Sequence, residues 1–124
     1  MGSRFYSRRV AHDAPVVTLA NAILLSALKK GAEAIWVGRD AAALQVRFRL
    51  GGVVHIELAP PLALHGPLVR RYAIMASLPT YPKGAAAEGE IVLEVGEHRA
   101  RFAIRVEGHG PGLVADLRVL AGAA

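Results

Sequence analysis

A histidine and a carboxylate stand two residues apart at His55 and Glu57. Side chains alternate along a strand, so these two would share one side of the strand predicted here. Such a pair could bind a metal ion or transfer protons. The spacing supplies no third ligand, because the other histidines are scattered and the chain has no cysteine. We therefore interpret the pair as part of a solvated strand face and predict no metal site and no catalytic residue.

A glycine-rich segment at residues 108–112 reads Gly-His-Gly-Pro-Gly. Its backbone amides could hold an anion, but the segment lacks a lysine and does not lead into a helix. We therefore predict a turn. The chain also lacks the phosphate-binding pattern Gly-x-x-x-x-Gly-Lys-Ser/Thr and the nucleophile pattern Gly-x-Ser-x-Gly. We expect a protein that is not an enzyme and that has no cofactor.

Arginines occupy alternate, outward positions of two predicted strands, and Trp36 lies in a third. If the arginine-bearing strands adjoin, they form a cationic surface suited to an acidic protein. Base-stacking aromatics are missing from that surface, which argues against nucleic acid. Trp36 either fills the core or anchors an interface. The predicted protein-contact residues are Trp36, Arg47, Arg49, Arg99, Arg101 and Arg105.

The size and composition of the chain fit one compact domain. It has 124 residues, 53% of them hydrophobic, and a formal net charge of +5. We assign residues 1–14 to a basic, flexible arm, residues 15–120 to the domain and residues 121–124 to a tail. The apolar stretches are too short to span a bilayer and no secretory signal is evident, so we expect a cytoplasmic protein.

The first half of the chain predicts a helix over residues 15–30, with Pro15 in its first turn and Gly31 just after its end. Short alternating segments then predict strands at 35–37, 44–50 and 54–58. A two-residue loop at 51–52 would place Phe48 opposite His55 and turn the two apolar sets to opposite faces. A three-residue loop at 51–53 pairs Phe48 with Ile56 in one core, and we predict this loop, with Gly52 at positive φ.

The second half repeats this order. We predict a helix over residues 64–78 and a loop over 79–88. Strands follow at 91–95, 99–106 and 113–119, and the first two are joined by a two-residue turn that sets Glu94 opposite Arg99. The result is an α+β fold: an antiparallel sheet of about six strands in two meanders, with helices packed on one face.

Several segments, taken in order, resemble one family. They are VVTLANAI (16–23), GAEAI (31–35), VRFRLGGV (46–53), RYAIMASL (71–78) and RV (105–106). The chain resembles the PAS-like N-terminal domain, often called N2, of type II secretion and type IV pilus assembly ATPases. The resemblance covers residues 15–120 and implies helices against an antiparallel sheet.

The departures from the family pattern bear on function. Glu90 replaces an arginine that in the family lies near the nucleotide of the motor domain, whereas Arg105 and Arg118 fall on family arginine positions. Trp36 replaces a histidine of the first strand. The resemblance therefore implies a free-standing N2 domain without the motor, and without one of its nucleotide-facing charges.

We accordingly expect a non-catalytic adaptor or regulator of pilus, secretion or motility and polarity machinery. The resemblance implies a protein partner, such as a pilus or secretion ATPase, a small GTPase or a response regulator. The alternative is a PAS-like sensor of a small molecule or nucleotide, with a cavity between sheet and helix. A homodimer through the apolar first helix is left open.

Overall fold

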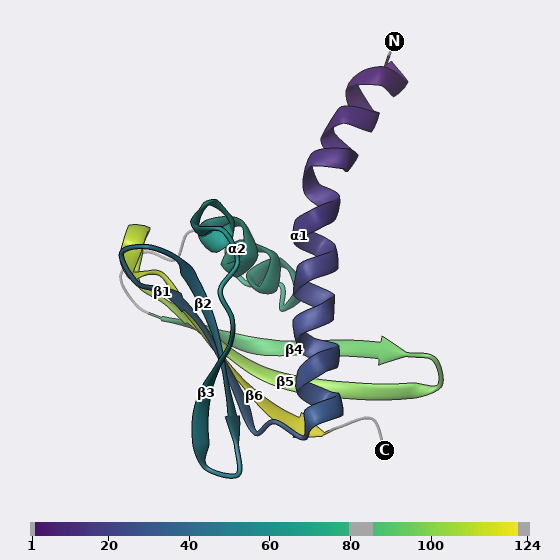
Figure 1. The fold of residues 1–124 in the computed structure, drawn as a ribbon. Helices are drawn as coiled ribbons and strands as arrows, with labels where there is room; N and C mark the ends of the chain where they lie inside the picture. Colours follow the sequence, from purple (N-terminus) through teal and green to yellow (C-terminus); the bar gives the residue numbers. More distant parts are fainter. Residues whose placement is uncertain (1, 80–85, 122–124) are drawn as a thin grey trace.

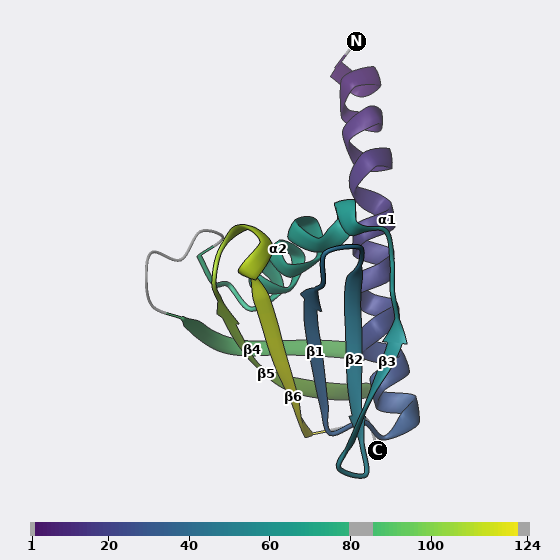
Figure 2. The same cartoon turned by 60° about the vertical axis from the view of Figure 1, so that its left-hand side comes forward.

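The computed structural model describes residues 2–79 and 86–121, with only the backbone for residues 2–14, 98 and 121. Its elements are α1 (Gly2–Lys30), β1 (Ala34–Arg39), β2 (Leu44–Leu50), β3 (Val53–Leu58), α2 (His65–Met75), β4 (Ala87–Val95), β5 (His98–Glu107) and β6 (Val114–Ala121). The strands form one antiparallel sheet in the order β3-β2-β1-β6-β5-β4. Both helices lie on one face of the sheet (Figures 1 and 2). The predicted α+β architecture of two meanders is confirmed.

Helix α1 ends at Lys30, as predicted, with Gly31 just after it. Gly31 has a φ of 69°, and the amide of Ala32 donates to the carbonyl of Ala27, which closes the last turn. The predicted start is wrong, because the helix begins at Gly2 and Pro15 lies inside it. A proline removes one backbone hydrogen bond and can bend a helix without ending it. The N-terminal part of α1 extends beyond the sheet (Figure 1), and the flexible arm stays a prediction.

The core lies between the sheet and the two helices. Phe48 from β2, Phe102 from β5 and Tyr72 from α2 are its largest fully buried side chains. The Tyr72 hydroxyl donates a hydrogen bond of 2.9 Å to the Ala20 carbonyl of α1, and burial raises the pKa of this hydroxyl. Helix α2 is shorter than the predicted 64–78, and Pro67 lies in its first turn.

The β4–β5 hairpin has the predicted register. Leu93 pairs with Ala100, and Glu94 pairs with Arg99 across the two-residue turn. Strand β4 begins at Ala87, earlier than the predicted residue 91. The predicted loop at 79–88 therefore overlaps this strand, and its residues 80–85 lie outside the described residues.

The β2–β3 hairpin differs from the prediction. Phe48 pairs with His55, and the turn contains only Gly51 and Gly52, with φ values of 57° and 80°. Positive φ at both central residues is typical of a type I′ turn, which matches the twist of the strands. The positive φ of Gly52 is confirmed, but the three-residue loop is wrong. The turn geometry prevails over a shared core, so Val54 and Ile56 lie on the face opposite the helices.

Candidate protein-contact face

The open face is the face of the sheet opposite the helices, and no helix of the described residues covers it (Figure 2). The strand pairings align its outward side chains in two rows across the sheet. One row is Ile56, Arg47, Trp36, Asp116, Arg105 and Glu88, and the other is Val54, Arg49, Ala34, Arg118, Ala103 and Glu90. At the β3 end, Trp36, Arg47, Arg49, Val54 and Ile56 lie together, and we call these five residues the tryptophan corner.

Trp36 and Arg47 form the centre of this corner. The guanidinium carbon of Arg47 lies 4.5 Å from the centroid of the Trp36 ring, within the range of a cation–π interaction. Both side chains are half-buried. Trp36 therefore lies on the open face and not in the core, and its role as a contact residue stays a prediction.

A hydrogen-bond network holds Arg47 in this position. Its Nε and Nη2 donate to Gln45 Oε1 at 3.1 and 2.6 Å, and Gln45 Nε2 donates to Asp40 Oδ2 at 2.7 Å. The other Asp40 oxygen accepts the backbone amides of Ala42 and Ala43 at the β1–β2 turn. These amide bonds hold the pKa of Asp40 below its ordinary value. The β1–β2 turn therefore holds the side chain of Gln45 in place through Asp40, and Gln45 holds the guanidinium of Arg47.

Gly38 provides the space for the indole. A Cβ atom built at Gly38 would lie 2.3 Å from Trp36 Cη2, closer than real contacts allow. Neither Gly38 nor Gln45 was among the predicted contact residues. Each lies two residues from a predicted contact residue on the same strand, so strand alternation would have placed them on the same face.

The arginines of β5 lie apart from those of β2. The predicted cationic surface required β2 and β5 to be neighbours. Strands β1 and β6 separate them, so their arginines do not form one continuous surface. Arg101 forms an ion pair with Glu90, and Arg105 contacts Glu88 at 2.8 Å and Glu107 at 3.6 Å. The bond to Arg101 holds the pKa of Glu90 below its ordinary value. Arg99 lies directly opposite Glu94 on the neighbouring strand.

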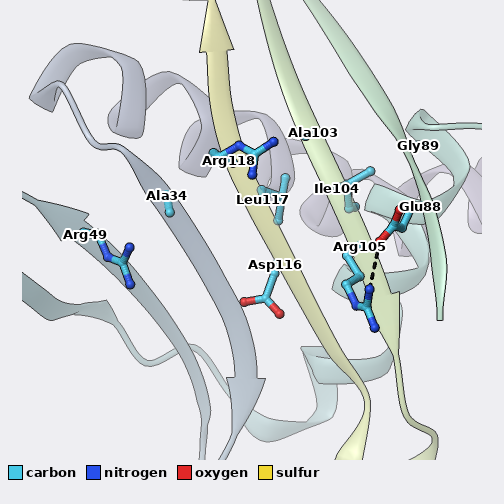
Figure 3. A pocket seen from close by; sticks show the side chains of 10 residues that line it. All are labelled: Ala34, Arg49, Glu88, Gly89, Ala103, Ile104, Arg105, Asp116, Leu117 and Arg118. Carbon is cyan, nitrogen blue, oxygen red and sulfur yellow. Dashed lines mark hydrogen bonds and ion pairs between the residues drawn. The ribbon is translucent and has the colours of Figure 1, made fainter. Parts of the chain in front are cut away.

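A hollow of about 430 Å³ lies on the open face between these two groups. Figure 3 shows Asp116 between Arg49 and Arg105, with Arg118 on the same strand as Asp116. Burial raises the pKa of Asp116. Within the described part of the chain, Arg49 and Arg118 have no ion-pair partner. Arg118 was not among the predicted contact residues, although it fell on a family arginine position.

This hollow is not where the sensor interpretation expected a cavity. That interpretation placed the cavity between the sheet and the helices, where Phe48, Phe102 and Tyr72 are fully buried. The hollow lies on the opposite face of the sheet.

The two remaining motifs of the sequence are the His55/Glu57 pair and the glycine-rich segment at 108–112. Glu57 forms an ion pair with Lys30 at the end of α1, and His55 is exposed. The described residues contain no group of three His, Cys, Asp or Glu side chains arranged for a metal ion. The glycine-rich segment forms a short 3-10 turn at Gly110–Gly112, as the turn prediction required. Among the helices described, none combines the length and hydropathy needed to cross a bilayer.

Comparison with known proteins extends over most of the chain. The family of type II/IV secretion system proteins matches residues 9–117. The type IV pilus assembly ATPase PilB of Myxococcus xanthus is 39% identical over 88 residues, which is 71% of this chain and 16% of that protein. The type II secretion system ATPase E of Vibrio cholerae is 36% identical over 107 residues, or 85% of this chain and 21% of that protein.

These matches confirm the resemblance found in the sequence. They also limit which properties of the relatives can be assigned to this chain. The chain spans about a fifth or less of the length of these two relatives. It contains no Gly-x-x-x-x-Gly-Lys-Ser/Thr motif, so the matched part does not include a phosphate-binding loop. The chain belongs to the family of type II/IV secretion system proteins.

Proposed function

We propose that this chain is a non-catalytic protein-contact module of a type II secretion or type IV pilus system. It binds a pilus or secretion ATPase in the cytoplasm, and the tryptophan corner makes the contact. The observation that carries this proposal is the stack of Arg47 on Trp36 on an uncovered sheet face. Tryptophan and arginine are the residues most enriched among those that dominate binding energy at protein interfaces.

The fixed position of Arg47 favours a binding surface over a merely solvated one. An arginine that only improves solubility gains nothing from being held by Gln45 and by an aromatic ring. An arginine held before contact loses less side-chain entropy on binding, which leaves more of the interaction energy for affinity. The two apolar side chains of the corner, Val54 and Ile56, add surface that a partner can cover.

The charge distribution favours an acidic surface on the partner. Arg49 has no carboxylate partner in the described part of the chain, and Arg47 is held by a neutral amide. Complementary charge raises association rates and excludes partners of the wrong sign. A small GTPase or a response regulator with an acidic patch is the alternative partner.

The proposal is tested with the purified chain immobilised and the full-length ATPase of the same organism in solution. The variant Arg47→Glu/Arg49→Glu is compared with Arg101→Glu/Arg105→Glu, which changes the net charge by the same amount elsewhere on the open face. We expect the first variant to weaken binding by about tenfold or more and the second to change it little. Thermal unfolding of each variant verifies that it is folded.

Equal loss in both variants would show that only net charge matters and would contradict the proposal. Unchanged binding in the first variant would exclude the tryptophan corner as the contact surface. If the wild-type chain binds no ATPase, the same assay with a GTPase or a response regulator tests the alternative partners.

A further inference from the structure

Strand β3 forms one edge of the sheet and exposes an unusual amount of apolar surface. Val53, Val54 and Ile56 are 57%, 53% and 59% exposed. An exposed edge strand can pair with a strand of another chain, and folded proteins usually protect such edges with lysine, proline or a covering segment. Between Val53 and Leu58, β3 has neither a lysine nor a proline, and its register with β2 is regular from Val53 to Ile56 and shifts only between Ile56 and Leu58.

The backbone of β3 has groups available for such pairing. In an antiparallel ladder, hydrogen-bonded and non-hydrogen-bonded residue pairs alternate. Leu50 and Val53 flank the two-residue turn and form the first hydrogen-bonded pair, so Val54 opposite Arg49 belongs to the other type. The same alternation applies to Ile56 opposite Arg47. The amide and carbonyl groups of Val54 and Ile56 therefore point away from β2, towards the free edge.

The side chains beside this edge indicate what kind of strand fits. A residue placed next to Val54 by an added strand would lie roughly 10 Å from the Arg49 Cα, two strand spacings away. An extended arginine can meet a carboxylate at this distance over the short Val54 side chain. Next to Ile56, an apolar residue would cover the exposed aliphatic surface, since Arg47 is held on Trp36.

We propose that an extended, acidic segment of a partner protein adds to β3 as a further strand of the sheet. Main-chain hydrogen bonds to Val54 and Ile56 hold the segment, a carboxylate faces Arg49 and an apolar side chain covers Ile56. Charge complementarity favours this occupant over a second copy of the chain, which has a net charge of +5 and would bring further unpaired arginines to the edge. The inference rests on the proposed function, because it specifies how the tryptophan corner binds.

The experiment uses a peptide of defined sequence and the whole isotope-labelled chain. The probe is acetylated, amidated Thr-Glu-Thr-Val-Thr-Glu-Thr, whose glutamates and valine share one face when it is extended. The matched control peptide has lysine in place of both glutamates. We expect the acidic peptide to shift the backbone amide resonances of Val54 and Ile56 and to slow their hydrogen exchange. The lysine peptide should bind about tenfold more weakly or not at all.

Two substitutions separate backbone pairing from side-chain contact. Val54→Pro removes an amide that points to the free edge and leaves the ladder with β2 intact, which an edge strand tolerates. Val54→Thr keeps the amide and the branched shape. We expect Val54→Pro to weaken binding of the acidic peptide by about tenfold and Val54→Thr to have little effect. The exchange rates of β2 amides verify that the hairpin is retained.

Three results would overturn the inference. Equal binding by Val54→Pro and Val54→Thr would show that no strand is added. The absence of any shift at millimolar peptide would show that β3 does not accept such a segment. Concentration-dependent dimers in sedimentation that are lost in Ile56→Lys would assign the edge to a second copy. Each result can occur while the ATPase still binds Arg47 and Arg49, so this inference and the proposed function can fail separately.

Discussion

The two halves of the sheet have the same strand pattern and use it differently. Each half is a three-stranded antiparallel meander whose middle strand, β2 or β5, carries outward arginines. In the β4–β6 half, glutamates of β4 pair with Arg101 and Arg105. In the β1–β3 half, the neighbours of Arg47 are an indole and an amide. An outward arginine thus becomes part of a neutralised face or of a contact surface according to its cross-strand neighbours.

The largest expected effect is a loss of stability when the core is truncated in either half, and the measurement tests whether the halves share one core. Phe48 and Phe102 occupy the middle strands of the two halves, and both are fully buried. We expect Phe48→Ala and Phe102→Ala each to lower the free energy of unfolding by about 3–5 kcal/mol in chemical denaturation. Two separate unfolding transitions in either variant would show that the halves are independent units.

A smaller effect is expected at Gly38, where the indole of Trp36 leaves no room for a side chain. In Gly38→Ala the new Cβ displaces the indole, and we expect a loss of about 1 kcal/mol and a red-shifted emission of the single tryptophan. Gly66→Ala in α2 is the control, because no atom outside its chain neighbours and the nearby helix backbone lies within 4 Å of its Cβ position. That variant should leave the emission unchanged. An unshifted emission in Gly38→Ala would contradict the described packing.

A still smaller effect is expected on the pH dependence of stability, through the ion pair in the β4–β6 half. The folded-state pKa of Glu90 is lowered by Arg101, so its contribution to stability is present above the unfolded-state pKa and is lost as the pH falls through the folded-state pKa. Glu90→Gln should therefore flatten the acidic limb of a stability curve measured by urea unfolding. Glu97→Gln, which removes a carboxylate from the neighbouring turn, is the control. Identical curves for Glu90→Gln and the wild type would exclude the ion pair in solution.

The smallest effect is expected at the boundary between the halves. Burial raises the folded-state pKa of Asp116, so ionisation disfavours the folded state and stability falls as the pH rises through the interval between the unfolded-state and folded-state values. Asp116→Asn should be more stable at neutral pH by about 0.5 kcal/mol or less, because solvent screens this carboxylate. The difference should vanish below both pKa values. A variant that is less stable at neutral pH would show that the arginines nearby outweigh burial.

Of the two hairpins, β4–β5 was predicted correctly and β2–β3 incorrectly, for a physical reason. In β4–β5, the two-residue turn and the shared apolar face favour the same register, so Leu93 opposite Ala100 followed directly. In β2–β3 the two criteria conflict. A shared core required three loop residues, whereas Gly51 and Gly52 alone make a type I′ turn. The backbone amide of Gly52 donates to Glu33 Oε1 at 2.8 Å, a contact from a distant segment that no local pattern contains.

The candidate site was predictable in part. The outward positions of Arg47 and Arg49 followed from the alternation of their strand, whereas the short predicted strand at residues 35–37 left the side of Trp36 open. The stack of Arg47 on Trp36 was not predictable, because it needs the pairing of β1 with β2. The separation of β2 from β5 depends on strand order, which the sequence pattern does not specify.

The position of β6 has a consequence for the time course of synthesis. This strand lies in the middle of the sheet, between β1 and β5, although it is the last of the described strands to be made. While the ribosome adds the preceding residues, β1 has an unpaired edge that waits for residues 114–121. Long-range strand pairing of this kind forms slowly, and an unpaired edge promotes aggregation in the meantime. Nascent chains stalled before β6 should therefore need chaperones more than the finished domain does.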